Sequence, residues 1–398
     1  MLSLRKLLLS GFVSSASWNT QELKPKVVFI GFFGDEGRSI VHNGFTVKEQ
    51  PKLFDFTQNN VTILGLSPQF PDIKCTPNGD VCVLVTGEGM SNALSSVMAL
   101  VTAPNLDLRQ TYFVAGGIAG GNPKRCGLGS VTFPRFSVQH SMQYEIDARE
   151  KPENFTTGYF PQGAINGDQP WGYVYNTEVM ALNDKLQQIA ADMVPEHELT
   201  DCKGCDEYRG KYTGDVYSAS QGHPKVLRHD VVTSDTWFTG ELLADAFDNR
   251  TLTWTNGTGR YCATAQEDGA VMTGILRATL MGKVDYKRLI IFRSISDVDR
   301  PHPGQAVLDN LFNPLPTYDS ALQNVWVAAK HVITGIIGQW DEKFRSGIEP
   351  DKYVGDLWGS LGGTPDFGPG VESGGKPVSI PNQLRKRSNR SDLVPVAL

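Results

Sequence analysis

Lys26-Val-Val-Phe-Ile-Gly31 is a continuous apolar run that ends in glycine, which is typical of a strand buried on both faces of a parallel sheet. Similar patterns predict further strands over residues 61–64, 81–86, 111–117, 130–139, 226–233 and 288–294. Helical spacing of apolar residues predicts helices over residues 91–103, 177–193, 239–249, 266–281 and 321–345. Because strands alternate with helices, we expect an α/β fold, a three-layer sandwich with a central mixed β-sheet.

Length and composition divide the chain into three parts. The 398 residues, 40% of them hydrophobic, can bury a large core, and we expect one α/β domain over residues 24–350. Residues 1–19 have the basic start and short apolar stretch of a targeting peptide, of either the secretory or the mitochondrial kind. Residues 351–398 turn to Gly, Pro and Ser and then to Arg and Lys without periodicity, so we expect a mostly disordered tail.

Glycosylation sequons favour the secretory route. The Asn-x-Ser/Thr pattern occurs at Asn60, Asn154, Asn249, Asn256 and Asn389. We therefore expect a secreted, cell-envelope or lumenal protein that is sorted by an N-terminal signal, with a mitochondrial location as the alternative.

The cysteines favour the same compartment. Cys75 and Cys82 flank a turn sequence that would bring two strands face to face, which suits a disulfide, although two unpaired thiols at the base of a hairpin would fit the same pattern. Cys202-x-x-Cys205 could suggest zinc, but the sequence has no second Cys-x-x-Cys and no spaced pair of histidines. We expect a loop disulfide or no function there, and neither a metal nor a cofactor.

Charge and hydropathy exclude two classes of function. A formal charge of −6 gives no attraction to a phosphate backbone, so nucleic-acid binding is not expected. The best candidate for a membrane span, residues 325–338, is short and interrupted by Lys330 and His331, whereas a spanning helix needs about 20 apolar residues. We therefore expect no membrane-spanning segment and no membrane pore.

Glycine-rich segments follow three of the predicted strands. They are Gly31-Phe-Phe-Gly34-Asp-Glu36-Gly-Arg38, Thr86-Gly87-Glu-Gly89 and Gly116-Gly117-Ile118-Ala-Gly-Gly121. Such turns let main-chain N–H groups approach a phosphate, a ribose hydroxyl or an attacking water, and ligands of open α/β sheets bind at the carboxyl ends of strands. Each segment alone is explained as well by a tight turn, but three in series predict a shared site.

Several longer motifs are characteristic of one family. They are Leu66-Ser-Pro-Gln-Phe-Pro-Asp72, Thr86-Gly-Glu-Gly-Met-Ser-Asn-Ala93, Asn122-Pro-Lys-Arg125, Gln143-Tyr-Glu-Ile-Asp-Ala-Arg149, Thr264-Ala-Gln-Glu-Asp268 and Ser296-Asp-Val-Asp-Arg-Pro301. With them, residues 24–350 resemble the fungal and bacterial purine nucleoside permeases, a branch of the nucleoside phosphorylase and nucleosidase superfamily. The resemblance implies a nucleoside phosphorylase-like fold and purine nucleosides, with phosphate left open as a second substrate.

The superfamily pattern also implies roles for individual residues. Asp297, which follows Ser296 at a strand end, matches the aspartate that protonates a purine ring nitrogen, a step that makes the purine a better leaving group. A helix cap or an arginine partner, Arg293 or Arg300, is the alternative for this carboxylate. Glu267, after Gln266, matches the carboxylate that holds the ribose hydroxyls, and Asp268 is the alternative by one residue.

The base-binding aromatic is expected from Ser234-Asp-Thr-Trp-Phe238. The resemblance makes either Trp237 or Phe238 the platform on which the base stacks, together with Ser296 at the base. Phe238 could equally be a plain core aromatic.

The first glycine-rich segment fits two mechanisms. Gly34 and Arg38, with Gly87, Gly117 and Ile118, could bind phosphate in a phosphorylase. Alternatively, Glu36 could be the base that activates water in a hydrolase.

A missing arginine favours the hydrolase. Hexameric phosphorylases place an arginine just before the central glycines, where this chain has Ala115, so a bidentate phosphate clamp is lost. Other basic residues that could replace it are Lys124, Arg125 and Arg149. We therefore expect hydrolysis of the N-glycosidic bond by Glu36 and Asp297. A nucleoside-binding protein that supports uptake without turnover is the main alternative, a structural relative without turnover is a third, and a homo-oligomer is left open.

Overall fold

The computed structural model describes residues 22–43, 55–56, 59–162, 164, 174–312 and 315–368. Its strands are β1 (Val27–Gly31), β2 (Asn59–Thr62), β3 (Asp72–Cys75), β4 (Val81–Val85), β5 (Tyr112–Gly121), β6 (Val131–Thr132), β7 (Phe136–Gln139), β8 (Gln143–Glu145), β9 (Tyr159–Pro161), β10 (Val179–Ala181), β11 (Val226–Leu227), β12 (Asp230–Thr233), β13 (Tyr261–Ala265), β14 (Leu289–Val298) and β15 (Gly355–Asp356). The α-helices are α1 (Gly34–Asn43), α2 (Met90–Thr102), α3 (Asp184–Asp192), α4 (Cys205–Arg209), α5 (Glu241–Trp254), α6 (Asp268–Leu280), α7 (Val307–Phe312) and α8 (Tyr318–Gly338).

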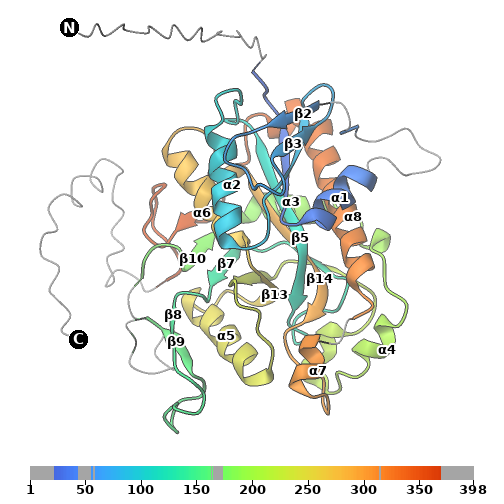
Figure 1. The fold of residues 1–398 in the computed structure, drawn as a ribbon, viewed down its shortest axis with the longest axis vertical. Coiled ribbons are helices and arrows are strands. Elements are labelled where there is room, and N and C mark those ends of the chain that lie inside the picture. The colour runs from blue at the N-terminus through green and yellow to red at the C-terminus, as the bar shows by residue number, and fades with distance from the viewer. Residues whose placement is uncertain are drawn as a thin grey trace, which may run out of the picture.

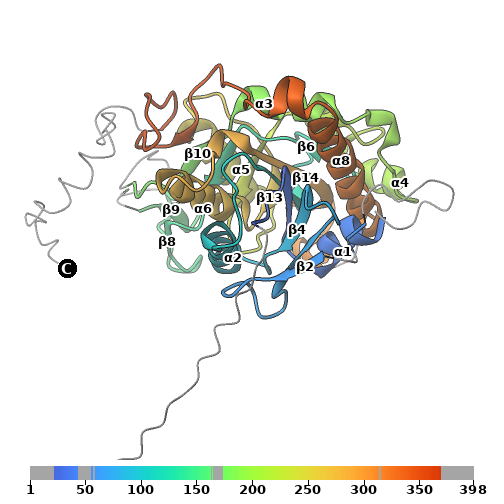
Figure 2. The same ribbon diagram turned by 90° about the horizontal axis from the view of Figure 1, so that it is seen from above.

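One mixed sheet forms the centre of the described chain, in the order β15-β10-β7-β12-β13-β5-β1-β4-β3-β2, with β14 joined to β5 and β6 joined to β14 and β11. The apolar run at β1 is buried at all five positions and pairs in parallel with β4 and β5 on either side. Helices α2 and α6 pack on one face of the sheet, and α1, α3 and α8 cover the other (Figures 1 and 2). The predicted α/β sandwich with a mixed sheet is therefore confirmed.

Two segments that were each predicted as one element contain two elements in the structure. The strand expected over 130–139 is two strands, β6 and β7, because Pro134 lies between them and has no N–H for a ladder. The helix expected over 177–193 begins with a strand, β10, and α3 starts only after Asn183, whose side chain accepts a hydrogen bond from the N–H of Leu186.

The remaining differences are smaller. The strand expected over 226–233 is interrupted between β11 and β12. The last long helix, α8, ends at Gly338 and is followed by a π-helical turn, Trp340–Phe344, rather than continuing to residue 345. Helix α5 and strand β14 extend beyond their predicted ends.

The described chain continues past residue 350 into the first part of the expected tail. Strand β15 pairs antiparallel with β10, and the ring of Phe367 packs edge-on against Phe136 at 5.3 Å between centroids. Residues 369–398 and the expected targeting peptide, 1–19, lie outside the described residues.

All six cysteines form disulfides. Cys75 and Cys82 sit opposite each other in the antiparallel pair β3–β4 and are bonded, as predicted. Cys126–Cys262 joins the loop after β5 to β13 and was not anticipated, because 136 residues separate the two cysteines. The third pair is Cys202–Cys205.

Two further expectations concern the surface and the membrane. The four described sequon asparagines, Asn60, Asn154, Asn249 and Asn256, are all exposed. Among the described residues, no helix combines the length and the apolar character that crossing a membrane requires.

Candidate functional site

A pocket of about 270 Å³ opens at the ends of β1, β12 and β13 and beside the second halves of β5 and β14. That volume is near the lower limit of about 300–1,000 Å³ that small-molecule sites occupy. Of the residues predicted for the site, eight line this pocket, namely Glu36, Ile118, Trp237, Phe238, Gln266, Glu267, Ser296 and Asp297. The fold thus brings together side chains that are up to 261 positions apart in the sequence.

Glu36 lies in the first turn of α1 and is fully buried from solvent. Its Oε2 accepts hydrogen bonds from the main-chain N–H groups of Phe32 at 2.6 Å and Phe33 at 3.3 Å, and its Oε1 accepts one from the N–H of Ile118 at 2.8 Å. Burial raises the pKa of Glu36 to about 8, while the Arg293 guanidinium opposes this rise. The pocket therefore contains a carboxyl that can exchange a proton near neutral pH.

The third glycine-rich segment is not a turn, which corrects the sequence-based expectation. Gly116–Gly121 forms the second half of β5. These positions are rich in glycine because side chains from other elements lie directly on the strand backbone. A Cβ on Gly116 would overlap the ring of Phe292, and one on Gly117 would overlap the carboxylate of Glu36. Gly117 thus makes room for Glu36, and the N–H of Ile118 bonds to that carboxylate.

Arg293 is the central cation of the pocket, and sequence reasoning considered it only as a partner for Asp297. Its guanidinium donates hydrogen bonds to Asp268 at 2.6 Å and to Glu267 at 3.0 Å, and it lies 4.2 Å from the centroid of the Phe32 ring. All three charged side chains are buried. An arginine within an otherwise apolar strand is the signal that could have predicted this ion pair, since buried charges need partners.

Glu267 has a fixed position at the start of α6. Its Oε1 accepts a hydrogen bond from the N–H of Gly89 at 3.0 Å, and its Oε2 binds Arg293. The carboxylate of Asp235 accepts from the N–H of Met90 at 2.8 Å, so two acids lie at the N-terminus of α2. Glu267 keeps unused lone pairs for a ligand hydroxyl, whereas Asp268, the alternative by one residue, does not line the pocket.

Asp297 faces the pocket without an arginine partner. Its Oδ2 accepts a hydrogen bond from the Ser296 hydroxyl at 2.9 Å, and burial raises its pKa above the ordinary value. The two arginines considered as partners bind elsewhere, Arg293 to Asp268 and Arg300 to Asp299 at 2.8 Å. A carboxyl with a raised pKa and no counter-ion is suited to holding a proton.

The two candidate aromatics differ in exposure. Trp237 is 69% exposed, although it lines the pocket. Phe238 is half-buried and packs edge-on against Phe247 at 4.7 Å between centroids. Trp237 is therefore free to cover a bound base, while Phe238 forms part of the pocket wall.

Among the residues expected to bind phosphate, Ile118 is the one that lines the pocket, and its N–H is already bonded to Glu36. Gly34 and Gly87 do not line the pocket, and the guanidinium of Arg38 pairs with Asp35 at the surface. The possible substitutes are also occupied by acids: Lys124 by Asp245 at 2.8 Å, Arg125 by Asp248 at 3.2 Å and Arg149 by Asp147 at 2.6 Å. The predicted phosphate site is therefore not assembled around this pocket.

Comparison with known proteins agrees with the family that the sequence motifs indicate. Residues 24–349 match the family model described as purine nucleoside permease (NUP). This chain belongs to the purine nucleoside permease family. A purine nucleoside permease of Candida albicans is 40% identical over 340 residues, which cover 83% of each chain.

Solved structures resemble this family member more distantly. A 5′-methylthioadenosine/S-adenosylhomocysteine nucleosidase of Neisseria meningitidis superposes with a TM-score of 0.44 at 12% identity, over 78% of this chain and 99% of the nucleosidase. The futalosine hydrolase of Helicobacter pylori gives a TM-score of 0.46 at 12% identity, over 80% of this chain and 98% of the hydrolase. Similarity of this degree carries no argument about activity.

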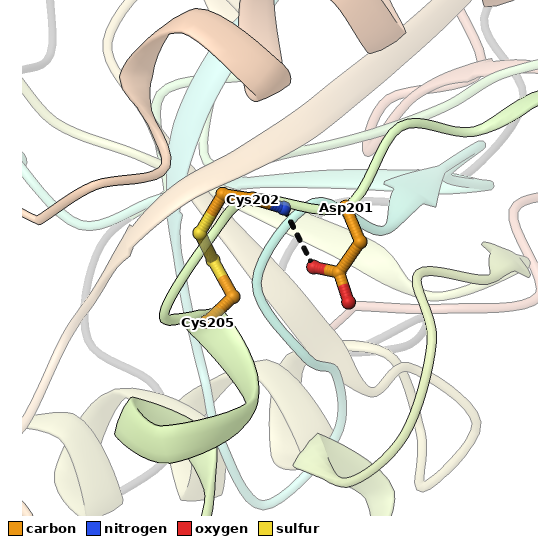
Figure 3. Close-up of side chains that lie close together, drawn as sticks. All are labelled: Asp201, Cys202 and Cys205. Atoms are coloured by element: carbon orange, nitrogen blue, oxygen red, sulfur yellow. Dashed lines mark hydrogen bonds between the residues drawn. A yellow bond between two sulfur atoms is a disulfide. The ribbon is translucent and has the colours of Figure 1, made fainter.

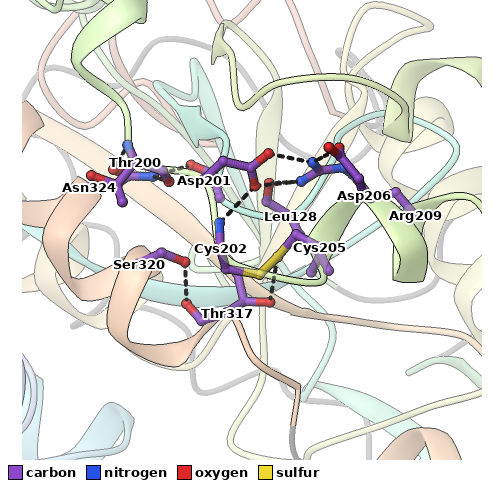
Figure 4. Close-up of a disulfide and its surroundings, with 11 residues drawn as sticks. Leu128, Thr200, Asp201, Cys202, Cys205, Asp206, Arg209, Thr317, Ser320 and Asn324 are labelled. Atoms are coloured by element: carbon purple, nitrogen blue, oxygen red, sulfur yellow. Dashed lines mark hydrogen bonds and ion pairs between the residues drawn. A yellow bond between two sulfur atoms is a disulfide. The ribbon is translucent and has the colours of Figure 1, made fainter.

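This permease-family chain has one further cluster of potential metal ligands among its described residues, Asp201, Cys202 and Cys205 (Figure 3). The two sulfur atoms are bonded to each other, so neither is a free thiolate ligand. Asp201 accepts from the N–H of Cys202 at 2.9 Å and pairs with the buried Arg209 at 2.6 Å, and Thr317 lies beside the Cys205 sulfur (Figure 4). The cluster is therefore a loop disulfide, one of the two outcomes expected from the sequence.

Proposed function

We propose that this chain hydrolyses the N-glycosidic bond of purine nucleosides. The observation that carries the proposal is a pair of carboxyls, the buried Glu36 and the partly buried Asp297, which line one pocket and both have raised pKa values. They approach β5 at Gly117 and Gly120, respectively. An acid for the leaving group and a base for the water are the two groups that hydrolysis of a glycosidic bond with inversion needs.

Each carboxyl has a defined part in the reaction. The protonated Asp297 donates its proton to a purine ring nitrogen as the bond between C1′ and N9 breaks, so the bonding electron pair leaves with the neutral purine. Water then adds to C1′ from the opposite side, and Glu36 accepts the proton that this water loses. The products are free purine and ribose, and the proton gained by Glu36 replaces the one that Asp297 gave.

The remaining pocket residues bind the two halves of the substrate. Glu267, fixed by Arg293 and the N–H of Gly89, accepts hydrogen bonds from the ribose hydroxyls. Trp237 and Phe238 provide the surface on which the base stacks.

Water is favoured over phosphate because of the charge in the pocket. The lining contains five acids, namely Glu36, Glu88, Glu267, Asp297 and Asp299. Among the lining residues that the structure describes, the only cation is Arg293, which two carboxylates already bind. A phosphate dianion would meet repulsion there rather than a clamp.

A second candidate is a nucleoside-binding protein that supports uptake, and the name permease of the Candida relative favours it. Such a protein needs the stacking surface and Glu267 but not the acid–base pair.

One experiment separates these functions. Purified protein is incubated with adenosine, inosine, guanosine or uridine, with and without phosphate, and free base, ribose and ribose 1-phosphate are measured. We expect free purine and ribose without phosphate, and no release by Asp297→Asn, while Asp309→Asn on the exposed face of α7 serves as the matched control. Nucleoside binding without base release would refute hydrolysis and support the uptake function.

A further inference from the structure

His140 is a polar group of the pocket that the proposed mechanism does not use. It follows the last residue of β7, is only 1% exposed and lines the pocket. Its Nε2 has no hydrogen-bond partner among the described residues, although it is buried. A buried polar atom without a partner is costly, and it is most simply explained by a ligand that supplies the missing partner.

The neighbours of His140 determine which of its nitrogens carries hydrogen. Its Nδ1 lies 3.4 Å from Nη1 of the buried Arg250, whose guanidinium has only donors, so Nδ1 must accept. Burial keeps the pKa of His140 well below its ordinary value, and the nearby Arg250 charge lowers it further. A neutral imidazole that accepts at Nδ1 carries its hydrogen on Nε2, so this edge of the pocket presents an N–H donor.

His140 lies at the aromatic end of the pocket. Its ring stacks on Phe247 at 4.3 Å between centroids, and Phe247 in turn contacts Phe238. Strand β7 is next to β12, from which the Trp237 and Phe238 segment leads, whereas Glu36 follows β1, four strands away in the sheet order. His140 therefore lies on the side of the pocket where the aromatic residues are.

We propose that the Nε2–H of His140 donates a hydrogen bond to an acceptor atom on the six-membered ring of the bound purine and so fixes how the base lies. The proposal rests on the proposed function only for the class of ligand. Arg250 is then a positioning residue, because it holds the imidazole in the donating tautomer without touching the base.

The test measures binding rather than turnover, in full-length protein carrying Asp297→Asn so that the nucleoside stays intact. Calorimetry compares adenosine with 1-deazaadenosine and 3-deazaadenosine, each of which replaces one ring nitrogen of the six-membered ring by C–H. With His140 present, we expect one of the two analogues to bind about tenfold more weakly than adenosine, since a buried donor loses its acceptor. His140→Phe keeps a ring against Phe247, and in this variant the difference should disappear.

His223→Phe is the matched control, because His223 is exposed and lies outside the pocket, and it should leave the discrimination unchanged. Retained discrimination in His140→Phe, or equal binding of all three ligands when His140 is present, would overturn the proposal. If the unsubstituted protein releases no base while this binding pattern is seen, the proposed hydrolysis alone would be overturned.

A second measurement does not depend on the variant being stable. In protein that retains His140, the ¹⁵N chemical shifts of its imidazole should show hydrogen on Nε2. In the Asp297→Asn protein, this His140 signal should move when adenosine is added. An Nε2 without hydrogen, or a signal that adenosine leaves unmoved, would refute the hydrogen bond.

Discussion

Titration of Glu36 should affect stability and activity in opposite directions over the same pH range. Its pKa is about 8 in the folded chain, against 4.5 as the ordinary value. Because a tenfold change in proton affinity is worth about 1.4 kcal/mol, ionising the buried carboxyl costs the folded state up to about 5 kcal/mol. The sign follows from the raised pKa: the stabilisation is complete below pH 4.5 and is lost as the pH rises towards 8.

Activity should change the other way. Glu36 can accept a proton from water only when it is ionised, so kcat/KM of the ligand-free enzyme should rise towards an apparent pKa of about 8. Hydrolysis is thus expected to be fastest where this residue stabilises the fold least.

Glu36→Gln tests both statements. The variant should lose hydrolysis, and the part of the pH dependence of unfolding that Glu36 causes should disappear, as measured by thermal denaturation between pH 4.5 and 8. The substitution also has a cost that does not depend on pH. All three contacts of the carboxylate are main-chain N–H donors, so an amide NH₂ must oppose one of them, which costs about 1–3 kcal/mol.

Glu349→Gln is the control, since Glu349 lies at the surface and pairs with Lys287. The reasoning fails if Glu36→Gln still hydrolyses nucleosides, or if its unfolding keeps the pH dependence of the unsubstituted protein.

Three further predictions concern other parts of the chain. Asp297→Asn should lower turnover by about 10²–10⁴-fold while nucleoside binding measured by calorimetry changes little, because an amide cannot transfer the proton; an equal loss of binding would contradict the acid role. Trp237→Ala should raise KM more than it lowers kcat, by an amount corresponding to roughly 1–3 kcal/mol per stacked base, and its high exposure means that the melting temperature should hardly move. Replacing the cysteines of Cys126–Cys262 with serine should destabilise the fold by about 5 kcal/mol in denaturant titrations, against about 2 for Cys75–Cys82, because chain entropy grows with the 136-residue and 7-residue separations. Similar losses for both pairs would refute the entropic explanation.

The parts of the fold that could be predicted are those whose pattern lies within the element's own sequence. The apolar runs of β1 and of the first half of β14 need no distant information, because a strand segment buried on both faces is mostly apolar. The two residues of β15 carry no such pattern, and they pair with β10, more than 170 positions earlier. A short strand of this kind cannot be inferred from its own sequence.

The residues of the candidate site were likewise only partly predictable from the sequence. The family resemblance identified Asp297 and Glu267, but it did not reveal that Arg293 joins Glu267 to Asp268. His140 gave no signal at all, since one histidine after an alternating strand is usually a core residue. Its importance depends on the neighbours Arg250 and Phe247, which only the folded chain brings near.

The glycine-rich second half of β5 limits which positions can be changed to alter the specificity of this protein. Gly117 and Gly120 touch Glu36 and Asp297 of the pocket, Gly116 touches the core ring of Phe292, and none of the three leaves volume for even a methyl group. A mutant library that varies them would therefore mostly yield chains in which Glu36 or Asp297 is displaced. Residues 236–238 and His140 offer a better choice, because new side chains there would reshape the space around the base while the two carboxyls keep their support.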